Sequence, residues 1–119
     1  MIYRQIYQQK WAIFFWILIS LVTFLLLIEL PPKPQTIPYL DKIQHAIIFI
    51  ILMLSAAMAW KPHRYWLAAA LILYGASTEL LQGMFTITRL ASVSDWLADV
   101  AGICIGLLIF VIYQKNAAK

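Results

Sequence analysis

The sequence predicts an all-α protein, a bundle of four helices that span a membrane. Of its 119 residues, 64% are hydrophobic and 12% are charged, whereas soluble domains carry about 25% charged residues. The apolar residues fall into four long segments, and a helix needs about 20 residues to cross a bilayer. No segment shows the alternation of apolar and polar residues that a transmembrane β-strand requires. The length fits a single domain, residues 1–119.

The first predicted span covers residues 11–30 and ends at Pro31 and Pro32. Arg4 and Lys10 precede it, as cations precede the apolar core of a signal peptide. That core, however, has about 7–15 residues and leads to small residues at the cleavage site. Here the apolar run is longer, and the sequence PPKP follows it. We therefore expect the first segment to be retained as a span.

The other three predicted spans cover residues 43–60, 65–81 and 96–113. Each has the length of a helical span. Aromatic residues lie near their ends: Trp60, Trp66, Trp96 and Tyr113. Such side chains favour the boundary between lipid and water, so they support the span boundaries that the apolar pattern gives.

The distribution of Lys and Arg predicts the orientation in the membrane, because cytoplasmic loops carry an excess of these residues. Six of the nine lie at the termini or between the second and third spans: Arg4, Lys10, Lys61, Arg64, Lys115 and Lys119. The remaining three lie in the other two loops: Lys33, Lys42 and Arg89. We expect both termini in the cytoplasm. The net charge of +4 therefore indicates topology, and no basic run points to a nucleic-acid partner.

The acidic residues gather on the other side of the membrane. All five lie at or near it: Glu29, Asp41, Glu79, Asp95 and Asp99. An ionisable group that faces lipid within a span costs about 2.5–3.5 kcal/mol, so Glu79 and Asp99, which lie inside spans, should turn toward the bundle interior. Glu29, beside Pro31, is interpreted as a solvated helix end. We expect His45, Glu79 and Asp99 to meet in a small polar pocket that opens away from the cytoplasm.

Small residues share the helix faces of these polar groups. Residues three, four or seven apart lie on one face of a helix, which places Gly75 beside Glu79. Gly102 and Gly106 likewise share the face of Asp99. Small residues let helices approach closely in lipid. We therefore expect Gly75, Gly102 and Gly106 at the contacts between helices.

The polar residues on this side form the predicted binding site. Its members are Asp41, Lys42, His45, Glu79, Gln82, Arg89, Asp95 and Asp99. Four acids face two cations, Lys42 and Arg89, which leaves a formal charge of −2 with His45 neutral. A proton, a metal ion or a cationic group of a ligand could relieve this charge. The guanidinium of Arg89 could also bind a carboxylate through two hydrogen bonds.

Helix capping is the simpler explanation for two of the acids. Asp41 and Asp95 begin their helices, where a carboxylate complements the helix dipole. Ser92-x-x-Asp95 also has the shape of a capping box. For Glu79 and Asp99, which lie inside spans, the simpler alternative is a hydrogen bond that holds neighbouring helices together.

A metal site is not expected from the sequence. His45 and the nearby acids offer suitable donor atoms, but there is no H-E-x-x-H motif and no pair of cysteines. The sequence likewise contains no Walker loop and no dinucleotide-binding glycine pattern. We therefore predict no metal and no cofactor.

The ordered polar residues resemble the VanZ-like family of small bacterial membrane proteins. The family pattern has Asp-Lys before a His, then E-x-x-Q, an Arg, D-x-x-x-N and two glycines four apart. The matching residues lie within residues 39–107: Asp41, Lys42, His45, Glu79, Gln82, Arg89, Asp95, Gly102 and Gly106. The sequence departs from the pattern at Asp99, where the family commonly has Asn, so a possible anion replaces an amide.

The resemblance implies the bacterial cytoplasmic membrane and cell envelope, because the family is named for a protein that confers teicoplanin resistance. It implies no reaction, and we rank three functions. The first is non-catalytic binding of a membrane lipid or lipid-linked cell-wall-precursor head group, which would influence glycopeptide susceptibility. The second is a structural or partner-binding membrane subunit. The third is an enzyme that acts on an envelope lipid, with His45 or Glu79 as its catalytic acid or base.

Overall fold

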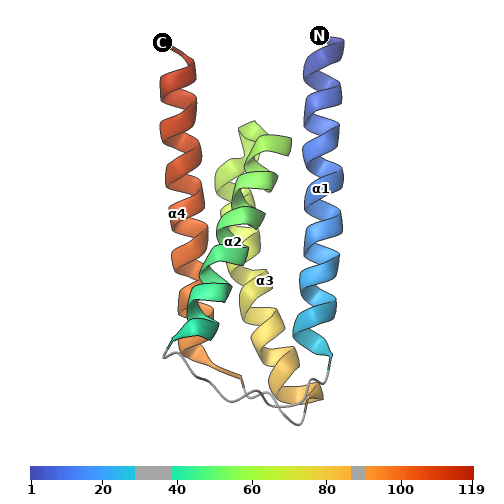
Figure 1. The fold of residues 1–119 in the computed structure, drawn as a ribbon, viewed down its shortest axis with the longest axis vertical. Coiled ribbons are helices and arrows are strands. Elements are labelled where there is room, and N and C mark those ends of the chain that lie inside the picture. The colour runs from blue at the N-terminus through green and yellow to red at the C-terminus, as the bar shows by residue number, and fades with distance from the viewer. Residues whose placement is uncertain (29–38, 87–90) are drawn as a thin grey trace.

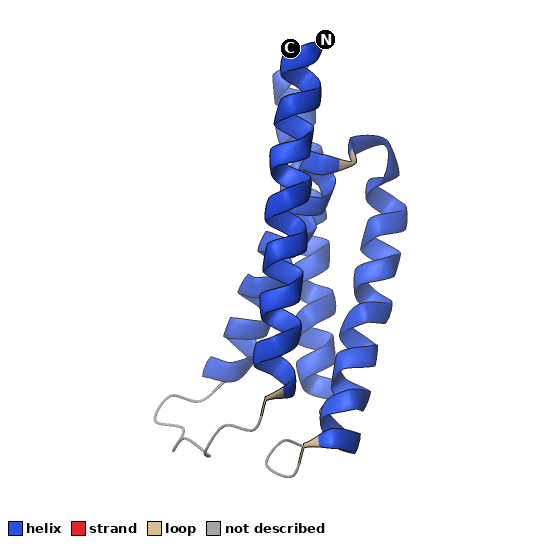
Figure 2. Ribbon diagram, turned by 90° about the vertical axis from the view of Figure 1, so that its right-hand side faces the viewer, coloured by secondary structure: helices blue, strands red, loops and turns tan. Residues whose placement is uncertain are grey.

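The computed structural model describes residues 1–28, 39–86 and 91–119 (Figure 1). This part of the chain forms four α-helices and one short 3-10 helix: α1 (Ile2–Leu27), α2 (Leu40–Ala59), η1 (Lys61–His63), α3 (Arg64–Phe85) and α4 (Val93–Ala117). All four α-helices are long and apolar enough to cross a membrane. The predicted all-α architecture of four candidate spans is therefore confirmed (Figure 2).

All four helices begin earlier than the apolar pattern predicts, and for α1 and α4 the sequence gives a reason. α1 begins at Ile2 rather than at residue 11, because the preceding residues include Gln, Arg and Lys, which favour helix, and no Pro or Gly. α4 begins at Val93 rather than at residue 96, because Ser92 caps it. The Ser92 hydroxyl accepts the Asp95 N–H at 3.2 Å, as the capping pattern predicts. The apolar pattern thus locates the span of a helix but not its ends.

The four helices run alternately up and down (Figure 1). Both termini and the α2–α3 connection lie toward one end, whereas α1 and α3 end, and α2 and α4 begin, at the other. α2 is central and packs against the other three helices. Within the described ranges α1 and α4 do not contact each other, and they flank α2 on opposite sides. This arrangement places the starts of α2 and α4 beside the end of α3.

α2 and α4 approach closely at two glycines. A Cβ atom on Gly102 would overlap the carbonyl oxygen of Ala46, and one on Gly106 would lie 3.0 Å from the carbonyl oxygen of Ile50. Glycines four apart form one continuous small-residue stripe, which allows close backbone contact between membrane helices. Because Asp99 lies one turn before Gly102 on the same face, this contact also sets the position at which Asp99 meets α2.

α1 is held to α3 by polar contacts near its carboxyl end. The hydroxyls of Thr23 and Tyr74 lie 2.6 Å apart, and the Gln82 amide donates to the Leu26 carbonyl at 2.8 Å. Hydrogen bonds between membrane helices contribute about 1 kcal/mol each. α1 is therefore fastened by side chains, whereas α2 and α4 meet backbone to backbone.

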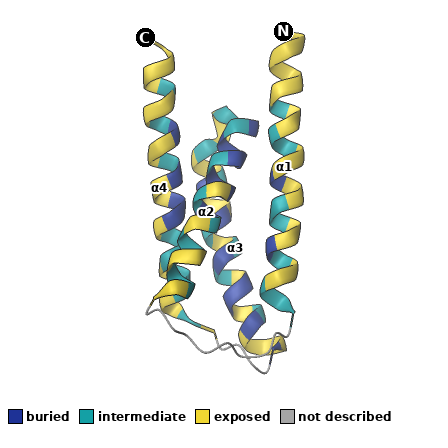
Figure 3. Cartoon of the chain, viewed as in Figure 1, coloured by how far each residue is buried: buried dark blue, intermediate teal, exposed yellow. Residues whose placement is uncertain are grey.

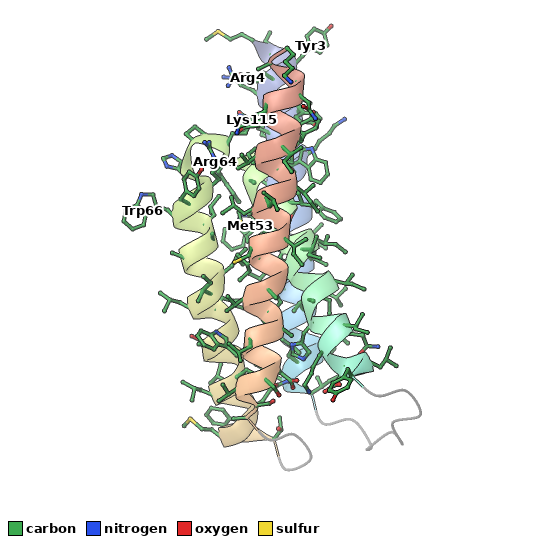
Figure 4. The ribbon with its side chains drawn as sticks, turned by 90° about the vertical axis from the view of Figure 1, so that its left-hand side faces the viewer. Tyr3, Arg4, Met53, Arg64, Trp66 and Lys115 are labelled. Atoms are coloured by element: carbon green, nitrogen blue, oxygen red, sulfur yellow. The ribbon has the colours of Figure 1, made fainter. Side chains whose placement is uncertain are left out.

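Large apolar side chains cover the outer surface of the bundle. Ile17 on α1, Leu73 on α3 and Leu108 on α4 are 60–69% exposed, whereas buried residues concentrate on α2 and on inward helix faces (Figure 3). Acyl chains can solvate such a surface, and water cannot do so without cost. Arg4 and Lys115 lie at the terminal end of the bundle (Figure 4). The fold is that of a multi-pass membrane protein with one basic end.

Candidate functional site

The acids of the described chain gather at the end of the bundle opposite the termini (Figure 1). Asp41 and His45 lie in the first two turns of α2, and Asp95 and Asp99 lie in the first two turns of α4. Glu79 lies near the carboxyl end of α3. The up-and-down arrangement brings these three helix ends together. The sequence alone could place the residues at one depth, and the bundle places them side by side.

A buried pair between His45 and Asp99 joins α2 to α4. His45 Nδ1 lies 2.8 Å from Asp99 Oδ1, and the two side chains are 14% and 1% exposed. The second oxygen, Oδ2 of Asp99, is buried and has no hydrogen-bond partner among the described residues. A Cβ atom on Gly75 would lie 3.1 Å from this oxygen. The glycine on α3 thus leaves room for the Asp99 carboxylate.

Glu79 connects α3 to the start of α4. Its Oε2 accepts the backbone N–H of Ser92 at 3.0 Å, while its Oε1 is buried without a partner in the described part of the chain. In a full capping box the acid three residues after the cap would accept that N–H. Here Glu79 accepts it instead, which leaves the carboxylate of Asp95 available to other groups. The residue as a whole is only 6% exposed.

Lys42 lies at the outer rim of the cluster. Its ammonium group is 3.3 Å from Asp95 Oδ1 and 3.4 Å from Asp41 Oδ2. The side chains of Lys42 and Asp41 are about one-third exposed, at 32% and 35%. Ion pairs at such exposure contribute about 0–1 kcal/mol. Lys42 therefore contributes mainly a positive charge that a ligand can reach, beside acids that lie deeper.

Three groups from three helices form the inner part of the cluster. A ring nitrogen of His45 and a carboxylate oxygen each from Glu79 and Asp95 all lie within 4.8 Å of one another. Imidazole and carboxylate are ligands for first-row divalent metals. Among the described residues, these three side chains have the donor atoms to hold a metal ion. Asp99 contacts the Nδ1 atom of the histidine.

Of the two remaining predicted site residues, the structure describes only Gln82. Gln82 is 4% exposed, and its amide donates to the Leu26 carbonyl of α1 rather than to an acid of the cluster. In the structure it therefore connects α3 to α1. Arg89 lies outside the described residues. Their roles in ligand binding stay predictions.

The structure adds two contacts to the site that sequence analysis did not predict. The backbone N–H of Ser92 binds Glu79 at 3.0 Å. The indole Nε1 of Trp96 donates to the Ile72 carbonyl at 3.0 Å, so this predicted interfacial residue also fastens α4 to α3. No sequence signal marks a backbone N–H as a partner of a distant acid. The capping pattern at Ser92 was the nearest indication.

A cavity of about 250 Å³ opens beside Glu79, between α3 and α4. Apart from Glu79 and Ser92 its walls are apolar and include Leu80, Val93 and Trp96. A larger apolar cavity of about 520 Å³ lies between α1 and α3 and involves none of the acids. Of these two cavities in the described part of the chain, the smaller one offers both a carboxylate and an apolar wall.

An apolar four-helix bundle with a partly buried histidine–carboxylate cluster at one end defines a small multi-pass membrane protein with a polar site near the ends of three helices. The chain matches the VanZ/LLP1 family over residues 1–114 and belongs to that family. The match extends through the first helix, which the resemblance of the polar motifs alone did not cover. No curated protein and no solved structure shows significant similarity to the chain. The family membership expected from the ordered polar residues is thereby confirmed.

Proposed function

We propose that the cluster binds the head group of a membrane lipid or of a lipid-linked cell-wall precursor in the bacterial cytoplasmic membrane. The observation that carries the proposal is the pair of buried carboxylate oxygens, Glu79 Oε1 and Asp99 Oδ2, without partners among the described residues. A buried polar atom left unsatisfied costs about 1–3 kcal/mol. Hydroxyl or amine donors on a head group would satisfy Glu79 and recover part of this cost.

The surroundings of Glu79 suit an amphiphilic ligand. The cavity beside it combines this carboxylate with the apolar side chains of Leu80, Val93 and Trp96. Lys42, about one-third exposed at the rim, can attract a phosphate. An apolar chain would lie against the cavity wall, the phosphate would lie near Lys42, and the donors would reach Glu79. Arg89 is proposed as a second cation for the phosphate.

The proposal requires the cluster to face away from the cytoplasm, with both termini inside. The basic residues support this orientation, because Arg4, Lys61, Arg64 and Lys115 lie toward the end that carries the termini. A lipid-linked precursor exposed on the outer leaflet would then reach Glu79 directly.

The orientation can be tested by cysteine labelling in a Cys104→Ser background, since Cys104 is the sole cysteine of the sequence. Val93→Cys at the acidic end and Ala118→Cys at the terminal end both replace exposed residues. A membrane-impermeant maleimide is expected to label Val93→Cys in intact cells, and Ala118→Cys only after permeabilisation. The reverse labelling pattern would place the acids in the cytoplasm and overturn the proposal.

Head-group binding can be tested by native mass spectrometry of the protein purified from bacterial membranes. The wild type is expected to retain a lipid that Lys42→Ala and Glu79→Gln lose, because each variant removes one polar contact to the head group. Lys61→Ala, a matched lysine variant at the opposite end, should retain it. Equal lipid retention in all four proteins would indicate that the cluster only holds the helices together.

Membership of the VanZ/LLP1 family suggests a test of the same variants in cells, by their effect on teicoplanin susceptibility. In a teicoplanin-sensitive bacterium, expression of the wild type is expected to raise the inhibitory concentration of teicoplanin. Lys42→Ala should lose this increase and Lys61→Ala should keep it. A change in susceptibility that is the same for both variants would separate the phenotype from the cluster.

A further inference from the structure

We propose that His45, Glu79 and Asp95 bind a first-row divalent cation such as Zn²⁺, with Asp99 orienting the histidine. The three residues come from three different helices, and one donor atom of each lies within 4.8 Å of the other two. This site shares Glu79 with the proposed head-group site, but the ion needs no lipid to bind, so the two proposals can be tested separately.

The spacing of the donor atoms is close to that of a metal site. Zinc binds histidine nitrogen and carboxylate oxygen at about 2.0–2.2 Å, so ligand atoms in a tetrahedral site lie about 3.4 Å apart. Here the donor atoms lie at most 4.8 Å apart, so each pair would have to approach by about 1.4 Å at most. A change in the side-chain rotamer of Asp95, which is 18% exposed, would supply such a movement and leave the bond from Ser92 to Glu79 intact.

Glu79 provides the second, independent indication of a bound ion. The residue is 6% exposed, and its Oε1 has no hydrogen-bond partner among the described residues, although Oε2 is bonded to the Ser92 N–H. The folded chain thus holds one oxygen in place and leaves the other without a donor inside the bundle. A cation can satisfy this carboxylate oxygen without supplying a donor hydrogen.

The Asp99–His45 pair has the arrangement of a carboxylate that orients a metal-binding histidine. Histidines that bind metals almost always donate their other ring N–H to a carboxylate, a carbonyl or water. Asp99 Oδ1 lies 2.8 Å from Nδ1 of His45, which leaves Nε2 as the ring nitrogen for the ion. By accepting a hydrogen bond from Nδ1, Asp99 would fix both the tautomer and the ring orientation of His45.

The donor set favours Zn²⁺ and similar ions over magnesium or calcium. One imidazole with two carboxylates suits first-row transition metals, whereas Mg²⁺ and Ca²⁺ prefer oxygen ligands alone. The ion would also offset the excess of acids at this end, where Lys42 is the one cation of the described residues that contacts them. Three protein ligands leave one position open, as in zinc sites that bind a further ligand. A phosphate oxygen could occupy that position.

Zinc binding to the full-length protein in detergent provides the test. After treatment with EDTA and dialysis against Zn²⁺, the wild type is expected to hold one zinc ion per chain by elemental analysis. Cobalt added to the metal-free protein should give the visible absorption of a four-coordinate, histidine-bound ion. His45→Ala and Glu79→Gln should lose both signals, whereas His63→Ala, the matched variant of the other histidine, should keep them.

Asp99→Asn tests whether Asp99 orients His45 or binds the ion itself. This variant should still bind one ion but with about 10–100-fold weaker affinity, because loss of a carboxylate that orients a metal-binding histidine typically weakens metal binding by that factor. Circular dichroism checks that each variant is helical, and Asp95→Asn, which alters a less buried ligand, replaces any variant that fails to fold. Absence of zinc from the wild type, or equal zinc in His45→Ala, Glu79→Gln and His63→Ala, would overturn the proposal. Because no lipid is needed, this outcome is separate from the lipid-retention experiment.

Discussion

Replacing His45 by leucine is expected to destabilise the metal-free protein by about 3 kcal/mol or more. The substitution leaves the Asp99 carboxyl group 1% exposed with neither oxygen hydrogen-bonded, since Oδ2 already lacks a partner among the described residues. Removal of one member of a buried pair is costly because the remaining polar group stays desolvated. The measurement is unfolding in mixed micelles with EDTA present, followed by circular dichroism.

The double variant His45→Leu/Asp99→Ala provides the decisive comparison. It removes both polar groups, so it should be more stable than His45→Leu alone, even though two side chains have changed. His63→Leu, in η1 at the opposite end, is the matched control and should unfold like the wild type. If the double variant is no more stable than the single one, the buried carboxyl group is not the source of the cost.

Gly102→Ala is expected to lower the free energy of unfolding by about 1–3 kcal/mol. An added Cβ would overlap the Ala46 carbonyl oxygen, a backbone atom that cannot rotate away. α2 and α4 would have to separate, which also weakens the contact between His45 and Asp99 one turn away. The cost should therefore appear as a lower unfolding midpoint and as weaker zinc binding.

Two further substitutions on α4 should lower the free energy of unfolding less than Gly102→Ala does. Gly106→Ala should cost less than Gly102→Ala, because its Cβ would lie 3.0 Å from the Ile50 carbonyl oxygen, where a small shift suffices. Ala101→Val adds bulk to a neighbouring exposed position and should leave stability unchanged. Equal stability of Gly102→Ala and Ala101→Val would contradict the close packing of α2 on α4.

The location of the polar cluster illustrates how far helical periodicity can predict a membrane protein. Glu79 shares a face with Gly75, and Asp99 shares one with Gly102, so the cost of exposing a carboxylate to lipid directs both inward. In the structure Gly75, Glu79, Asp99 and Gly102 are all buried. Burial thus follows from the period of a single helix.

The pairing of these side chains does not follow from that period. The predicted site offered the acids two cations, Lys42 and Arg89, and two further polar side chains, Gln82 and His45. The structure joins His45 to Asp99 but directs Gln82 to the Leu26 carbonyl of another helix. Glu79 is bonded to a backbone N–H, a group that every residue except proline carries and that no sequence motif marks. Partner choice depends on the offset between helices rather than on their composition.

The sequence by itself determined that this chain forms four apolar helices, with its acids at one end and its bases largely at the other. Apolar length and the cost of burying charge depend only on local order along the chain. Only the tertiary structure decided that His45, Glu79 and Asp95 come within 4.8 Å. Hydrogen bonding and metal binding require atoms to be placed to a few tenths of an ångström. For His45 and Asp95, the close contact of Gly102 with Ala46 contributes to that placement, because it determines how α4 packs on α2.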